Sequence, residues 1–263
     1  MKYFFISLIS IIFSIHSVTY SQIIDNVEND VGSFFTTGGN LATSFFSFDQ
    51  PTQLKFAGSL LAIGAGYSVD YNIKKFAARN HSPFNDNLFS IDKIYGSGYT
   101  LIGIGGLYGY GILFHNDEVR KIGLQTIEAV GYAGIITTVL KTIVGRSRPY
   151  TNEGKFRFRP INFSAAHTSF PSGHSTVAFA VSTVLANNTN SLFLKILCYS
   201  ASTLVVGARL YHNAHWFSDT IAGSAIGYFV GDFVSKPETE NKQNDKGLSF
   251  NVGFNSINLS YKF

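Results

Sequence analysis

The 263-residue sequence contains little charge and a single cysteine. Charged residues make up 14% of the chain and hydrophobic residues 45%, and the mean hydropathy is +0.14. This composition is unusual for a soluble protein and favours a protein in or at a membrane. The lone Cys198 excludes an intrachain disulfide and a cysteine-anchored metal site, and its apolar surroundings indicate a buried small hydrophobic residue.

Runs of basic residues are also missing. The net charge is only +4, and no cluster of lysine and arginine resembles a nucleic-acid-binding patch. We therefore expect no nucleic-acid partner. The length fits one well-packed domain better than two.

The first residues have the pattern of an export signal. Lys2 is followed by an apolar stretch from Tyr3 to Ile15, and then by small and polar residues that end at Ser21. This pattern predicts a signal peptide at residues 1–21. An uncleaved membrane anchor is the alternative, although the apolar core is short for a membrane span. Either segment would place the protein in the bacterial cell envelope.

Apolar blocks separated by polar turns predict an all-α fold. Residues 22–53 have the composition of a polar surface segment, and residues 54–234 form the expected domain, an antiparallel six-helix bundle embedded in the membrane. Several blocks have only about 16 residues, fewer than the roughly 20 that cross a bilayer comfortably. Their many glycines nevertheless favour helices packed in lipid. The six helices are expected near residues 54–69, 99–114, 122–144, 174–186, 192–208 and 216–234.

The C-terminal residues 235–263 form a polar linker and an alternating tail. Apolar and polar residues alternate from Leu248 to Phe254 and again from Ile257 to Phe263, which predicts a short β-hairpin. Two strands cannot close a barrel. We expect the hairpin to lie on the bundle or to pair with another chain.

The first of three polar segments contains Lys141 and Arg148. Lys141 lies at the end of a predicted helix, and Pro149 keeps Arg148 out of helical geometry. Two cations therefore approach one helix end from different directions, which suits an oxyanion with several oxygens. By itself, such a cluster is more often an anchor at the membrane interface.

The second segment, Ser172-Gly173-His174, precedes a predicted helix. Ser172 is a plausible N-cap, and Gly173 allows a ligand to approach the backbone closely. The free amide groups and the helix dipole would form an anion cradle with His174 at its edge. A capped helix with a surface histidine is the ordinary explanation of this segment taken alone.

The third segment runs from Arg209 to Asp219. His215 and Asp219 are four residues apart, so on a helix they would share a face and the carboxylate could hold the imidazole. Such a partner fixes the ring tautomer and leaves the other nitrogen free to attack. Further ligands at suitable spacing are missing, so neither a metal nor another cofactor is expected.

Some neighbouring residues have ordinary explanations. His167 and His212 are expected to be surface histidines. Arg146 lies in a basic loop that could attract anionic head groups or simply be solvated.

The three segments are expected to meet. In an antiparallel bundle, the ends of the third and fifth helices lie beside the starts of the fourth and sixth. Together the segments would supply three cations, amide donors and two histidines, as phosphoryl transfer without a metal requires.

The patterns Lys-x6-Arg-Pro, Pro-Ser-Gly-His and Arg-x5-His-x3-Asp resemble the signature of the type 2 phosphatidic acid phosphatase superfamily. That superfamily also includes bacterial class A acid phosphatases and vanadium haloperoxidases. The resemblance implies that His215 attacks phosphorus, that Asp219 orients it and that His174 protonates the leaving oxygen. It further implies that the phosphate is bound by Lys141, Arg148, Ser172, Gly173 and Arg209.

The expected function is hydrolysis of a lipid phosphate monoester or pyrophosphate through a phosphohistidine, without a metal. A nonspecific acid phosphatase, a vanadate-dependent haloperoxidase and a membrane-lipid-binding or interaction module are the alternatives. The resemblance implies a site that faces the periplasm. The basic residues around Lys74 and in the 145–171 loop instead agree with a cytoplasmic end.

Overall fold

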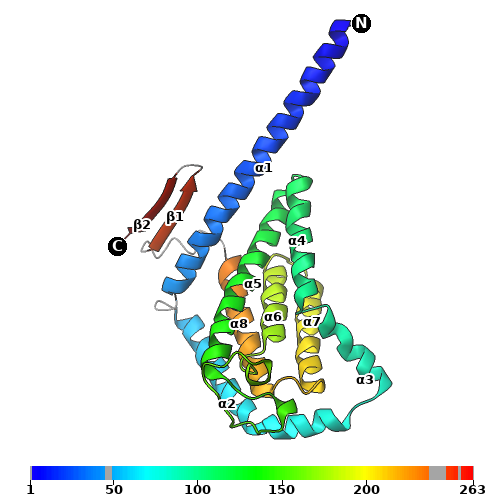
Figure 1. The fold of residues 1–263 in the computed structure, drawn as a ribbon, viewed down its shortest axis with the longest axis vertical. Helices are drawn as coiled ribbons and strands as arrows, with labels where there is room; N and C mark the ends of the chain where they lie inside the picture. Colours follow the sequence, from blue (N-terminus) through cyan, green and yellow to red (C-terminus); the bar gives the residue numbers. More distant parts are fainter. Residues whose placement is uncertain (1, 45–48, 237–246, 254–255, 263) are drawn as a thin grey trace.

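The computed structural model describes residues 2–44, 49–236, 247–253 and 256–262, with side chains described for 22–44 and 49–236 (Figure 1). The helical part of these described residues confirms the all-α prediction and contains eight α-helices rather than six. They are α1 (Lys2–Ser44), α2 (Gln50–Arg79), α3 (Pro83–Leu88), α4 (Gly98–Leu113), α5 (Asp117–Val144), α6 (Gly173–Asn187), α7 (Leu192–Tyr211) and α8 (Phe217–Ser235).

The six predicted helices correspond to α2 and α4 to α8. α2 extends well beyond both predicted ends, and α3 was not expected. Short 3-10 turns connect these helices: η1 (Phe89–Lys93), η2 (Pro149–Thr151) and η3 (Ala165–His167).

Strands β1 (Gly247–Gly253) and β2 (Ser256–Lys262) pair antiparallel, with Gly247 opposite Lys262. They occupy the two ranges in which the alternating pattern fell, and β1 lies beside α1 (Figure 1). Their side chains are outside the described residues, and the helices alone position the site.

Residues 22–53 were predicted as a polar surface segment, and each of the side chains described in it except that of Asp30 is at least partly exposed. Most of this segment is helical, because α1 continues to Ser44. Asp30 is buried in it, where it accepts hydrogen bonds from the Tyr108 hydroxyl at 2.8 Å and from Arg120 Nη1 at 3.0 Å. Charge pairing therefore allows an acidic stretch to pack on α4 and α5.

α6 is the central helix of the bundle and packs against α5, α7 and α8. Where α6 packs against α8, the backbones of the two helices are in direct contact. A Cβ placed on Gly223 would lie 2.3 Å from the carbonyl oxygen of Ser172, and one on Gly227 would lie 2.3 Å from that of Thr176. Only glycine permits this approach, which brings the start of α8 against the start of α6.

The surface of the helices is strongly apolar. Large hydrophobic side chains are exposed along α2, α4, α5 and α7, among them Leu61, Ile102, Ile135 and Phe193. Among the described residues, α5 and α7 are long and apolar enough to cross a membrane, by length and composition alone.

The ends of α5 and α7 and the starts of α6 and α8 lie at the same end of the bundle, as expected (Figure 1). α5 ends at Val144, and its C-cap, Gly145, has a left-handed φ of 60°. A Cβ there would lie 1.8 Å from the Arg159 carbonyl oxygen. The chain thus turns sharply from Lys141 into the loop that contains Arg148.

Candidate active site

His215 lies in the turn between α7 and α8, and only 3% of it is exposed. Nδ1 is 2.7 Å from the Ser169 carbonyl oxygen, which can only accept, so the ring proton is assigned to Nδ1. Burial lowers the pKa of His215 to about 3, and the positive charges of Lys141 and Arg148 act in the same direction, against the Asp219 carboxylate. The ring is therefore neutral near pH 7, and the lone pair of Nε2 is free to attack.

Asp219 is fully buried in the first turn of α8. Its carboxylate accepts hydrogen bonds from Arg146 Nη1 at 2.5 Å, Ser169 Oγ at 2.5 Å and the Trp216 backbone amide at 2.9 Å. Oδ2 lies 3.9 Å from His215 Nδ1, which is too far for a hydrogen bond. The expected direct bond is replaced by Ser169, because His215 precedes α8 and does not share a helical face with Asp219.

The phosphate-binding candidates Lys141 and Arg148 are held by backbone carbonyls. Lys141 Nζ donates to the Thr168 carbonyl oxygen at 2.6 Å, and Arg148 Nε donates to that of Ala165 at 2.7 Å. Arg148 Nη1 lies 3.5 Å from Nε2 of His215. Burial lowers the pKa of Arg148, which nonetheless keeps its charge near neutral pH. An anion attached to Nε2 would therefore contact this guanidinium.

Ser172 and Gly173 form the start of α6. Ser172 is the N-cap, and its hydroxyl accepts a hydrogen bond from the Ser175 amide, as predicted. A Cβ on Gly173 would lie 3.6 Å from Cε of Lys141, so the start of the helix lies beside the end of the Lys141 side chain. Helix amides and a lysine together form a binding site for an anion.

The imidazole of His174 lies close to charged side chains from the other two segments of the site. Burial lowers the pKa of His174 to about 4, and the charges of Arg209, Arg148 and Lys141 act in the same direction, against the Asp92 carboxylate. Arg209, in the last turn of α7, is fixed by a 2.6 Å ion pair with Asp92 of η1. The structure thus brings the candidates from all three segments to one end of the bundle.

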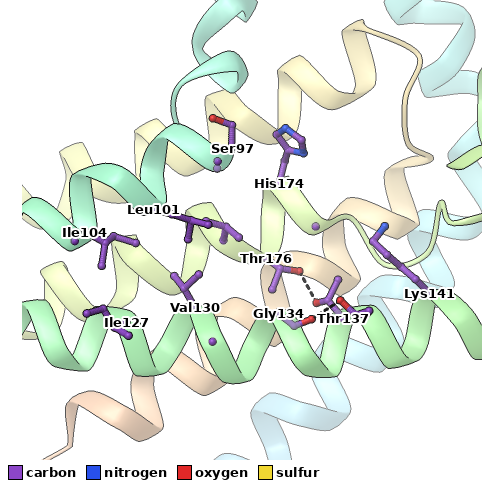
Figure 2. Close-up of a pocket in the computed structure, with 17 residues that line it drawn as sticks. Ser97, Leu101, Ile104, Ile127, Val130, Gly134, Thr137, Lys141, His174 and Thr176 are labelled. Carbon is purple, nitrogen blue, oxygen red and sulfur yellow. Dashed lines mark hydrogen bonds between the residues drawn. The ribbon is translucent and has the colours of Figure 1, made fainter. Parts of the chain in front are cut away.

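A cavity of about 680 Å³ begins at this point and runs between α4, α5 and α6. Figure 2 shows Lys141 and His174 toward one end of the cavity, with apolar side chains toward the other. Glycines of α4 and α5 keep it open, since a Cβ on Gly105 or Gly134 would meet nothing within 4 Å. The apolar side chains are Leu101, Ile104, Ile127 and Val130.

Arg146 is a functional candidate that was expected in a solvated or head-group-binding loop, yet it is 1% exposed. Besides Asp219, it pairs with Asp70 of α2 at 2.7 Å, and Nη1 also donates to the Ser218 hydroxyl at 2.8 Å. Asp70 in turn accepts from the Ser218 amide at 2.9 Å. The first turn of α8 is therefore held by the Asp70 carboxylate of α2, which no sequence pattern had indicated.

His167 is less exposed than expected, and Lys155 of the same loop is also buried. His167 is 8% exposed and lies 3.2 Å from Glu153. Lys155 is 8% exposed and donates to the Tyr67 carbonyl oxygen at 2.6 Å. His212 is partly exposed and pairs with Asp92. Among the described residues, no group of three or more histidine, cysteine or acidic side chains is placed to hold a metal ion.

Comparison with known proteins finds similarity to phosphatases. The sequence model of the PAP2 superfamily matches residues 123–241. A lipid A 1-phosphatase of Rhizobium etli is 35% identical over 114 residues, covering 41% of this chain and 47% of the relative. A lipid A 1-phosphatase of Porphyromonas gingivalis is 35% identical over 178 residues, covering 67% of this chain and 35% of the relative.

Among solved structures, the fold resembles a transmembrane PAP2 type phosphatidylglycerolphosphate phosphatase of Bacillus subtilis. The TM-score is 0.56 at 23% identity, over 75% of this chain and 98% of that one. The chain spans less than half the length of each of these two lipid A 1-phosphatases.

Proposed function

Because this chain belongs to the PAP2 superfamily, we propose that it is a phosphatase that hydrolyses lipid phosphate esters through a phosphohistidine on His215. The observation that carries the proposal is the neutral, buried His215, whose Nε2 faces Arg148 at 3.5 Å. A nucleophile with a free lone pair beside a fixed cation suits in-line attack on a phosphate.

The reaction takes place in two steps. In the first, Nε2 of His215 attacks phosphorus while the ester bond breaks. His174, which takes up a proton from solvent when the anionic phosphate binds beside it, gives that proton to the leaving oxygen. In the second, neutral His174 takes a proton from water, whose oxygen attacks phosphorus and breaks the N–P bond, releasing inorganic phosphate. Lys141, Arg148, Arg209 and the amides at Ser172 and Gly173 stabilise the charge on the equatorial oxygens, and Asp219 positions His215 through Ser169.

The substrate is a lipid rather than a soluble monoester. The apolar cavity starts at Lys141 and His174, where the phosphate would bind, and continues between helices along Leu101 and Ile104. A soluble phosphate monoester would leave that cavity empty, whereas an acyl or isoprenyl chain fills it. The lipid A 1-phosphatases among the relatives are consistent with such a substrate.

We place the bundle in the membrane of the bacterial envelope. The exposed apolar side chains of α2, α4, α5 and α7 would be costly in water and favourable in lipid. The partner surface is therefore the bilayer, from which the substrate reaches the site.

The proposal is tested with purified protein in detergent and a panel of phosphates. We expect phosphate release from lipid substrates, with and without chelator, at a kcat/KM at least tenfold above that for a soluble monoester. His215→Asn should abolish turnover while the protein still folds, and acid-labile phosphate should label the wild type only. Near-normal turnover by His215→Asn would overturn the mechanism.

The same preparation tests the haloperoxidase alternative. Vanadate should inhibit phosphate release as a phosphate analogue. If vanadate instead produced peroxide-dependent halide oxidation, the phosphatase proposal would be overturned.

The periplasmic orientation of the site has a separate test. Lys155 is unsuitable for labelling because it is buried, whereas Ser164 in the site loop is exposed. A Ser164→Cys variant, in a Cys198→Ser background, should react with an impermeant thiol reagent in spheroplasts. Asn190→Cys, in the α6–α7 turn at the opposite end, is the matched control and should stay unlabelled. The reverse pattern would place the site in the cytoplasm.

A further inference from the structure

The loop between α5 and α6 packs three of its stretches side by side. The Arg148 amide donates to the Ala166 carbonyl oxygen at 2.9 Å, and the Ser147 amide donates to that of Arg157 at 2.9 Å. The stretch that follows α5 therefore pairs with both later ones. The three stretches are residues 145–148, 157–159 and 165–169.

The last of these stretches fixes the reacting groups. Its backbone carbonyl oxygens accept hydrogen bonds from Arg148 Nε at 2.7 Å, Lys141 Nζ at 2.6 Å and His215 Nδ1 at 2.7 Å. The three acceptors are Ala165, Thr168 and Ser169. A shift of this stretch against the one that follows α5 would therefore move both cations relative to the nucleophile.

Glu153 joins all three stretches. Its Oε2 accepts a hydrogen bond from the Ser147 hydroxyl at 2.7 Å and lies 3.2 Å from Nε2 of His167. Its Oε1 accepts from Arg159 Nη2 at 2.8 Å. The hydrogen bond from Ser147 lowers the pKa of Glu153, so the group is a carboxylate near neutral pH. One charged side chain thus connects the stretches that carry and hold the cations.

The contacts of Glu153 differ in their surroundings. Its pair with Arg159 has both side chains partly exposed, and such a pair contributes little to stability. Loss of the carboxylate would instead leave the fully buried Ser147 hydroxyl without an acceptor. It would also leave His167 without a bonded ring nitrogen, because Nδ1 has no partner among the described residues. Both losses favour a rearrangement of the loop, and a displacement of about 1 Å at a catalytic group can slow a reaction about a hundredfold.

We propose that Glu153 is a positioning residue of the phosphatase site. Through Ser147 and His167 it keeps the stretch 165–169 in register with Arg148, and so fixes the cations around the phosphate. None of its contacts is with a group that we place on the phosphate. This inference rests on the proposed function and adds a residue that acts on the transition state rather than on binding of the lipid chain.

The test compares Glu153→Gln with the wild-type protein on one lipid phosphate. We expect kcat to fall about tenfold and the inhibition constant of vanadate to rise by a similar factor, because both depend on where the cations lie around phosphorus. KM should change less than about twofold, since the apolar cavity between α4, α5 and α6 is formed by other residues. Glu118→Gln is the matched control. Glu118 is exposed in the first turn of α5, at the far end of that helix from Lys141, and its variant should keep all three quantities.

A second variant shows whether Glu153 acts through Ser147. Ser147→Ala removes the buried hydroxyl and should by itself lower kcat several-fold. In the Glu153→Gln background the same change should lower kcat less than it does in the wild type, because the contact is already altered. Full additivity would mean that Glu153 does not act through Ser147 and would overturn the proposal.

The outcomes separate this role from the proposed function. A wild-type protein that released no phosphate from any lipid substrate would refute the function, and the role of Glu153 with it. An active wild type whose kcat and vanadate inhibition were unchanged in Glu153→Gln would overturn the positioning role alone. A change in KM only, or in the melting temperature only, would also overturn it, because lipid binding or stability would then explain the effect.

Discussion

Nδ1 of His215 and Oδ2 of Asp219 lie 3.9 Å apart, and Ser169 connects them. The Ser169 carbonyl oxygen accepts from Nδ1 at 2.7 Å, while its hydroxyl donates to Oδ2 at 2.5 Å. The residue that orients the nucleophile is therefore a serine of the loop before α6. The carboxylate acts on the ring through that serine and through its charge.

This relationship predicts different effects for two variants. Ser169→Ala keeps the carbonyl that holds His215 and loses only the bond to Asp219, so kcat should fall about tenfold. Asp219→Asn removes the negative charge beside the imidazole and leaves Arg146 less compensated, so kcat should fall a hundredfold or more. Steady-state kinetics with one lipid phosphate checks both. An unchanged kcat in Ser169→Ala would contradict the bridging role.

The buried Arg146 predicts a stability effect. Arg146→Met leaves the carboxylates of Asp70 and Asp219 buried without their counter-ion and should destabilise the protein by about 3–5 kcal/mol. Adding Asp70→Leu removes one of the two unpaired charges. The double variant should therefore be less destabilised than the sum of the single variants, as measured by thermal unfolding in detergent.

Arg159→Met serves as the control for Arg146→Met. Arg159 pairs with Glu153, but its side chain is 40% exposed. Its loss should cost less than about 1 kcal/mol. Strict additivity of Arg146→Met and Asp70→Leu would show that the two side chains do not interact.

The close contact of α6 and α8 predicts that Gly223 does not tolerate a side chain. A Cβ there would lie 2.3 Å from the Ser172 carbonyl oxygen, so Gly223→Ala must push the start of α6 away from α8. We expect a lower melting temperature and at least tenfold lower kcat/KM, because Ser172 and His215 would separate. Gly103→Ala on α4, where a Cβ would meet nothing within 4 Å, should leave both quantities nearly unchanged. Equal behaviour of the two variants would argue against this packing.

The pKa of His215 predicts how stability depends on pH. It is lowered from 6.5 to about 3 in the folded protein. Between these values the unfolded chain binds a proton that folded His215 does not, so stability is lost as pH falls through this window. His215→Asn should therefore lose less stability than the wild type between pH 6.5 and pH 4, as measured by thermal unfolding. Parallel curves for the two proteins would contradict the lowered pKa.

The sequence by itself determined six of the helices, apart from their exact ends, and the three polar segments. Apolar periodicity and local capping residues specify each helix, and these act over a few neighbouring residues. Ser172 is an N-cap, and Arg148 is extended before Pro149, as the sequence predicted. The order of the helices also determined that Lys141, Gly173 and His215 meet at one end, because antiparallel neighbours alternate in direction.

Only the tertiary structure decided which residues support that end. The partners of Arg146 are 76 and 73 positions away in the chain, at Asp70 and Asp219, and no local pattern connects them. The same is true of Asp92, which pairs with Arg209 across 117 positions. Burial turns such charges from solvated side chains into fixed partners, and burial results from how the helices pack. The reactive groups are therefore encoded locally, whereas their orientation and the shape of the cavity follow from the packing.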